Sequence, residues 1–217
     1  MTRVFACLAV AAFLAACQSS PAPSGANLAT PQSVTIQPGD VPGMQRCDTS
    51  GDVAAVLNQE KSQGSLGYDM HATEWEQWKR QGAVDAYFAV YGHTAADCAA
   101  ASGTTTGAPT GGLMVGLVVQ FKDTNGAARN FSRESTLMGL GPKDIRFIEL
   151  AGGTTTFGSA TGLGDDSVIG SAVVAGSAYF VAMWQNGRFE SDFMGYDTGF
   201  TESDNAVLAM NKRIIPA

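Results

Sequence analysis

Residues 167–195 read SVIGSAVVAGSAYFVAMWQNGRFESDFMG and contain the strongest structural signal of this chain. Asn186-Gly187 is the dipeptide most typical of a two-residue hairpin turn, and Gly176-Ser177 suits a second turn of the mirrored type. Counting outward from both turns places six large apolar side chains on one face: Ile169, Val173, Phe180, Trp184, Phe189 and Phe193. A slip of one residue would destroy this agreement. The sequence therefore predicts an antiparallel meander over 167–174, 178–185 and 188–195, with Trp184 opposite Phe189 and Phe180 opposite Phe193.

The second face of this meander carries Tyr179, Met183, Glu190 and Asp192, and we expect it to be partly exposed to solvent. Two more strands are predicted at 83–91 and 113–122, because apolar residues alternate along both segments. The segment between them, 93–112, has almost no large apolar residue and is expected to lack regular structure.

Start and stop signals predict four helices: near 51–63 behind Thr49 and Asp52, from Thr73 to about Arg80 before Gly82, after Asp123, and after Thr201. In the last of these, Val207, Met210 and Ile214 recur at core spacing. The fold class predicted from these elements is α+β, an antiparallel sheet backed by several helices.

Length and charge bound the function. The chain has 217 residues, with 20 acidic against 13 basic residues and a formal net charge of -7. We expect one globular domain over 43–217. An acidic surface repels phosphate backbones, so nucleic acid is not an expected partner.

The N-terminal sequence predicts the location of the protein in the cell. An apolar run from Val4 to Leu14 follows Arg3 and is too short to span a bilayer. It ends in Leu14-Ala15-Ala16-Cys17, which resembles the lipobox of bacterial lipoproteins. That resemblance implies a signal peptide over 1–16 and a lipid anchor on Cys17. Gln18 then favours the outer membrane, facing the periplasm. An ordinary secretory signal is the alternative.

Residues 17–42 are rich in Ser, Pro, Ala, Gly and Thr and are predicted to be a flexible tether. In an oxidising compartment, Cys47 and Cys98 are expected to form a structural disulfide. A redox pair or a metal site is the alternative, although neither cysteine has a second Cys or a His at ligand spacing.

Three turn sequences carry a second resemblance: Phe121-Lys122-Asp123 leading into Gly126-Ala127, residues 162–167, and the hairpin at 184–189. They are similar to secreted bacterial lipoproteins and sensor-type modules with PsbP-like sheets. The resemblance implies an antiparallel sheet backed by helices and, in most members, no assigned enzymatic activity. No catalytic residue transfers, because the matching positions are turns and core residues.

We therefore expect a non-enzymatic binding or sensing module, tethered to the cell envelope, that binds a small apolar ligand or an envelope protein. Four aromatic residues are the candidate ligand-binding side chains: Trp75, Trp78, Tyr87 and Tyr91. For the tryptophan pair, packing in the core is the alternative. A second hypothesis is an assembly accessory whose exposed sheet face docks a partner.

Catalytic and metal chemistry have few candidates. The chain has two histidines, His71 and His93, so a histidine triad or a multi-histidine metal site has few ways to form. Asp123 and Asn125 lack the spacing of a calcium loop. No cofactor or metal is expected. A hydrolase, the third hypothesis, would require one of the histidines to lie within hydrogen-bond reach of a serine and an acid.

Overall fold

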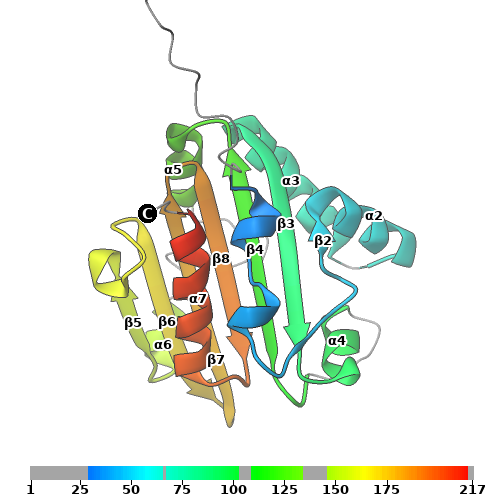
Figure 1. Ribbon diagram of the computed structural model, residues 1–217, viewed down its shortest axis with the longest axis vertical. Helices are drawn as coiled ribbons and strands as arrows, with labels where there is room; N and C mark the ends of the chain where they lie inside the picture. The colour runs from blue at the N-terminus through cyan, green and yellow to red at the C-terminus, as the bar shows by residue number, and fades with distance from the viewer. Residues whose placement is uncertain (1–28, 66, 103–108, 134–145, 215–217) are drawn as a thin grey trace, which may run out of the picture.

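The computed structural model of this protein describes residues 29–65, 67–102, 109–133 and 146–214. The expected signal peptide, Cys17 and the first part of the expected tether lie outside the described residues. An eight-stranded sheet runs through the described part of the chain in the order β1-β3-β4-β8-β7-β6-β5, and β2 also pairs with β3 (Figure 1). Every neighbouring pair is antiparallel, which confirms the α+β class.

The strands are β1 (Gln45–Arg46), β2 (Gly51–Asp52), β3 (Ala83–Gly92), β4 (Leu113–Phe121), β5 (Thr154–Phe157), β6 (Ser167–Val174), β7 (Ser177–Asn186) and β8 (Phe189–Tyr196). The helices are α1 (Pro31–Val34), α2 (Val53–Gln63), α3 (Tyr68–Gln81), α4 (Ala95–Ala101), α5 (Thr124–Phe131), α6 (Arg146–Leu150) and α7 (Phe200–Ile214). Short 3-10 turns cover Pro38–Asp40 and Gly158–Thr161. None of the helices in the described ranges combines the length and the apolar character that crossing a membrane requires.

The meander β6-β7-β8 is confirmed, but its predicted register is wrong by two residues. The turns are Ala175-Gly176 and Gly187-Arg188, so Trp184 pairs with Ser191 in β8 and with Ser167 in β6. Gly187 has φ 55°, which suits the first central position of a hairpin turn. A shift of two residues keeps every side chain on its predicted face, because side chains alternate with period two.

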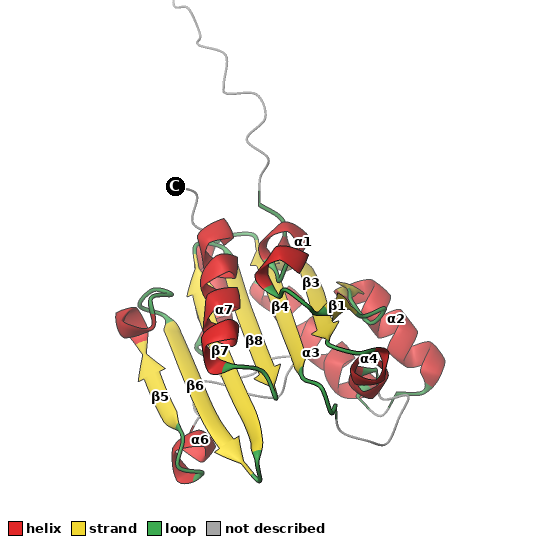
Figure 2. Cartoon of the chain, turned by 60° about the horizontal axis from the view of Figure 1, so that its bottom comes forward, coloured by secondary structure: helices red, strands yellow, loops and turns green. Residues whose placement is uncertain are grey.

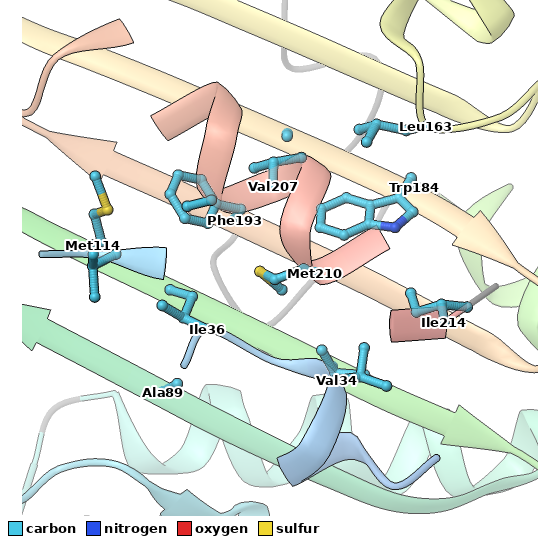
Figure 3. Close-up of a cluster of buried hydrophobic side chains, with 14 of the residues drawn as sticks. Val34, Ile36, Ala89, Met114, Leu163, Trp184, Phe193, Val207, Met210 and Ile214 are labelled. Atoms are coloured by element: carbon cyan, nitrogen blue, oxygen red, sulfur yellow. The ribbon is translucent and has the colours of Figure 1, made fainter. Parts of the chain in front are cut away.

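The predicted apolar face of the meander is the centre of the main core (Figure 3). The rings of Phe180 and Phe193 make an edge-on contact at 5.8 Å between centroids. Helix α7 covers this face with the three residues predicted for it, Val207, Met210 and Ile214, which are all buried. Val173 is the exception on the sheet, because it lies near the hairpin tip and is 59% exposed.

The expected tether is wrong for residues 29–42. Val34, Ile36 and Val41 are buried in the same core. Figure 3 shows Val34 and Ile36 beside α7, on the face of the sheet that α7 covers. Gly116 of β4 allows this close approach, because a Cβ at that position would lie 2.8 Å from Ile36. The composition of this segment is typical of a linker, but its three apolar residues anchor it in the core. Residues 29–42 therefore belong to the globular domain.

The opposite face of the sheet, which we call the back face, is covered by α2, α3, α5 and α6 (Figure 2). The expected partial exposure of this face is therefore wrong for Met183, Glu190 and Asp192, which are each 2% exposed. Helix α5 lies over β7 and β8 at this place, so these positions are in the interior. At Met183, Glu190 and Asp192 the meander therefore lacks the exposed face on which the assembly hypothesis depended.

The helix boundaries differ from the predicted ones where capping was misread. Asp52 is the N-cap of α2 without a side-chain cap bond, and α3 begins at Tyr68 rather than Thr73. Gly82, with φ 101°, ends α3 as predicted. Asp123 caps α5 as predicted, because its carboxylate accepts from the Gly126 amide at 2.8 Å.

The described parts of the segment 93–112, which are 93–102 and 109–112, contain a helix that was not expected. Helix α4 begins here behind Thr94, in a reciprocal capping box with Asp97. The Thr94-x-x-Asp97 spacing is a capping signal, but it precedes a short, alanine-rich segment without the apolar periodicity that predicts a helix.

Candidate functional site

A cavity of about 560 Å³ lies on the back face, where β3 and β8 end and β4 and β7 begin. We call it the sheet-face cavity. Its floor consists of side chains from four strands: Phe88, Val90, Leu113, Val115, Tyr179, Met194 and Tyr196. Its walls come from α2, the first turn of α3 and the C-terminal end of α4, with Val56, Gln59, Glu60, Gln63, His71, Ala100, Ala101 and Ser102 among the lining residues.

Strand register explains why the floor is apolar. Val115 pairs with Val90 on one side and Met194 on the other, so their side chains form one row across three strands. Tyr196 pairs with Tyr179, and the two rings meet edge-on at 5.2 Å between centroids. Helices α3 and α5 cover the other end of the back face. The cavity is the part of that face left between α2 and α4.

A disulfide holds one wall in place. Cys47 and Cys98 are bonded, with their Cα atoms 5.2 Å apart and a sequence separation of 51, which confirms the expected bridge. Cys98 lies in α4, so the bridge ties this helix to the segment after β1. Ala101 and Ser102, at the end of α4, line the cavity.

Asp97 holds the same helix from its other side. Its buried carboxylate accepts hydrogen bonds from the amides of Thr110 at 2.8 Å, Gly111 at 2.9 Å and Thr94 at 2.9 Å. Burial alone would raise the pKa of Asp97, but these hydrogen bonds and that of the Thr94 hydroxyl together lower the pKa below its ordinary value. The carboxylate therefore connects α4 to the start of β4.

The cavity has one distinctly polar wall, formed by Glu60 of α2 and His71 of α3. His71 Nδ1 lies 2.8 Å and 3.0 Å from the two carboxylate oxygens of Glu60. The side chain of Glu60 is 19% exposed and that of His71 is 23% exposed. Glu60 is the one Asp or Glu among the described lining residues, and none of those residues is Lys or Arg.

The four aromatic residues predicted to line one concavity do not do so. Trp75 and Trp78 belong to α3 and pack edge-on at 6.3 Å in the cluster on the back face. Tyr87 and Tyr91 point to the other face of β3, where they join the main core. The prediction is wrong because alternation along β3 separates the tyrosines from α3. The core-packing alternative describes Trp78, which is fully buried.

The alternation along 83–91 and 113–122 predicts that Phe88, Val90 and Val115 lie on the apolar faces of their strands, and they do. It does not predict that these residues line a cavity. No sequence signal shows that the helices covering this face leave one end of it open, because that depends on where α2 and α4 lie in space.

The histidines meet only part of the requirement for a hydrolase. His71 has an acid partner in Glu60, but no serine of the described residues hydrogen-bonds to its ring. His93 is exposed. Asp165 and Asp166 are exposed just before β6. No cluster of three His, Cys, Asp or Glu side chains suited to a metal ion occurs within the described ranges.

Two carboxyl groups are buried deeper on the same face. The Asn130 side-chain amide donates to Glu190 at 2.9 Å. Burial raises the pKa of Glu190 to about 8, and burial followed by the charges of Glu190 and Glu74 raises the pKa of Asp192 well above its ordinary value. Asp192 Oδ1 has no hydrogen-bond partner among the described residues. Glu190 is therefore expected to be largely protonated at neutral pH, and burial favours the protonated form of Asp192 in the same way.

Comparisons with known proteins identify no family. No protein-family model matches this sequence, and the comparison with curated proteins found no match. Among solved structures, the chain is similar to the extracellular domain of PknH from Mycobacterium tuberculosis, with 11% sequence identity and a TM-score of 0.37. The match covers 62% of this chain and 66% of that domain. A similarity at this level carries no conclusion about activity or partners.

Proposed function

We propose that this protein is a non-enzymatic binding module that takes a small apolar molecule into the sheet-face cavity. The observation that supports the proposal is the cavity itself, about 560 Å³ in volume, with Phe88, Val90, Val115 and Met194 in its floor. Small-molecule sites in proteins are typically concave, mostly apolar and between about 300 and 1,000 Å³. The arrangement fits a ligand that gains its binding energy from burial.

The architecture of the walls supports the same proposal. The disulfide and the hydrogen bonds of Asp97 fix α4 before any ligand is present. A preformed wall lowers the entropy lost on binding. The floor is held by the strand pairings of β3, β4 and β8.

We also propose that the module is tethered to the cell envelope through Cys17, with residues 1–16 as its signal peptide. The support is the sequence Leu14-Ala15-Ala16-Cys17 behind a short apolar run. Several acyl chains on one residue give a durable anchor, because each buried methylene contributes about 0.8 kcal/mol. On this proposal the domain faces the periplasm from the outer membrane, and a linker ends before Ala29.

A fluorescence titration tests the binding proposal. The probe is N-phenyl-1-naphthylamine, an uncharged apolar dye that becomes bright in apolar surroundings. Val115→Trp fills the cavity from its floor and is expected to abolish the bright signal. Val84→Trp is the matched control, because Val84 lies on β3, is 50% exposed and does not line the cavity.

Circular dichroism establishes that both variants fold. Ala101→Trp fills the same cavity from the α4 wall, so it serves if Val115→Trp does not fold. Wild-type protein that leaves the dye dark would refute the proposal. Equal binding by the wild type and both cavity-filling variants would place the dye elsewhere and refute it as well.

A further inference from the structure

The charges around the sheet-face cavity are one-sided. Glu60 is the one acidic side chain among the described lining residues, and no Lys or Arg accompanies it. The whole chain carries a formal net charge of -7, which at long range favours the approach of cations over anions. An anionic group entering this cavity would meet a carboxylate in partly desolvated surroundings, where repulsion is stronger than in water.

The pair Glu60–His71 still has hydrogen-bonding capacity for a ligand. A carboxylate has about four acceptor positions on its two oxygens, and the His71 ring uses only part of them. The second ring nitrogen of His71, Nε2, makes no hydrogen bond to any described residue. With Nδ1–H donating to Glu60, a neutral ring presents Nε2 as an acceptor. With the His71 ring neutral, both groups of this polar wall can accept hydrogen bonds from a ligand.

The floor imposes the other half of the selection. Phe88, Val90, Val115 and Met194 offer no charged partner, and they lie across three neighbouring strands. A ligand that satisfies both parts has an apolar body for the floor and a donor group at one end for Glu60 and His71.

We propose that the cavity selects a cationic amphiphile, an aliphatic chain that ends in an ammonium group, with its chain on the sheet floor and its head at Glu60 and His71. The proposal rests on the proposed function and adds the chemical class of the ligand. The ammonium group donates to the Glu60 carboxylate and to Nε2 of His71. The charge of Glu60 disfavours a fatty acid whose aliphatic chain has the same length as that of the ammonium compound.

Displacement of N-phenyl-1-naphthylamine by decylammonium, decanol and decanoate, each below its micelle concentration or solubility limit, tests this assignment. Decylammonium is expected to displace the dye at a concentration about tenfold lower than decanoate, with decanol in between. Glu60→Gln removes the charge but keeps an acceptor oxygen, so the preference for decylammonium over decanoate is expected to fall to about threefold or less. Dye and decanol binding are expected to stay unchanged.

Glu76→Gln is the matched control. Glu76 lies on α3 with its side chain 58% exposed and does not line the cavity, so this variant keeps the wild-type preference. If Glu60→Gln does not fold, salt dependence replaces it, because added salt weakens the preference if it arises from charge.

The outcomes separate the two proposals. Decanoate that binds as tightly as decylammonium, or a preference that survives Glu60→Gln, overturns the ligand class while the cavity remains a binding site. Loss of dye binding in the wild type itself would instead refute the proposed function.

Discussion

Arg213, near the end of the last helix, forms an ion pair with Asp40, 173 residues earlier in the chain, with Nη2 and Oδ2 2.6 Å apart. The same guanidinium donates to the carbonyl oxygens of Val34 at 3.1 Å and Thr35 at 3.0 Å. The side chain of Asp40 is only 9% exposed. These bonds fasten residues 34–40 to α7, beside it on the same face of the sheet, so this segment is part of the globular domain.

Replacing Arg213 is therefore expected to release this segment. Arg213→Gln removes charge-assisted hydrogen bonds and is predicted to lower the free energy of unfolding by about 2 kcal/mol. Hydrogen exchange of the amides of 34–41 should quicken. Lys212→Gln is the control, because Lys212 is the exposed neighbour on the same helix. Unchanged exchange at 34–41 in Arg213→Gln would show that the apolar anchors hold the segment alone.

Stability is predicted to fall as pH rises from about 4.5 to about 8. In this window the unfolded chain has released the proton of Glu190 while the folded protein keeps it, because burial raises the pKa of Glu190 to about 8. One retained proton gives a slope of about 1.4 kcal/mol per pH unit. The raised pKa of Asp192 acts in the same direction.

Glu190→Gln isolates this contribution. The amide keeps an acceptor for Asn130 and adds a donor for Asn130 Oδ1, which has no hydrogen-bond partner among the described residues. The variant is expected to unfold with a smaller pH slope and to be more stable than the wild type at pH 8. Glu76→Gln should leave the slope unchanged, because its side chain is exposed. A wild-type stability that rises across this window in urea unfolding would contradict the burial of an ionisable Glu190.

Breaking the disulfide is predicted to affect both stability and binding. Cys47→Ser with Cys98→Ser removes a bridge across 51 residues, which in the chain-entropy model contributes about 4 kcal/mol. Because α4 forms a wall of the cavity, dye affinity should also fall under conditions in which the variant is still folded. Equal affinity in the folded double variant would mean that Asp97 alone positions α4.

The lipid anchor has its own test. Expressed from the full sequence in a bacterial host, the protein is expected to incorporate radiolabelled palmitate and to sediment with the envelope membranes. Cys17→Ala should abolish the label, whereas Cys7→Ala should not, because Cys7 lies in the expected signal peptide. A label that persists in Cys17→Ala would contradict the proposed attachment site.

Local signals predicted most of the fold. Two glycine-containing turns located β6, β7 and β8, and period-two alternation located β3 and β4. The prediction gave the correct face for each side chain but a register shifted by two residues. The turn dipeptides do not show which of their residues belongs to a strand and which to the loop. Asn186 stays in β7, where its side chain donates to Leu163 and Asn211 across the core.

The candidate site was much less accessible to sequence reasoning. The sequence does not show on which side of the sheet Tyr87 and Trp78 lie, and in the structure they lie on opposite sides. The contact between Glu60 and His71 joins two helices whose packing is a tertiary feature. For residues 29–42 the prediction of a flexible tether was wrong, because it followed the Ser- and Pro-rich composition and not the three apolar residues that anchor the segment.

The most direct test of the account is a map of amide chemical shifts in isotopically labelled protein during titration with N-phenyl-1-naphthylamine. We predict the largest shifts in the strand ends that carry Phe88, Val90, Val115 and Met194, and in α4. Saturable shifts confined instead to α7 and its neighbours Val34 and Ile36, or no shifts at all, would contradict a binding site in the sheet-face cavity.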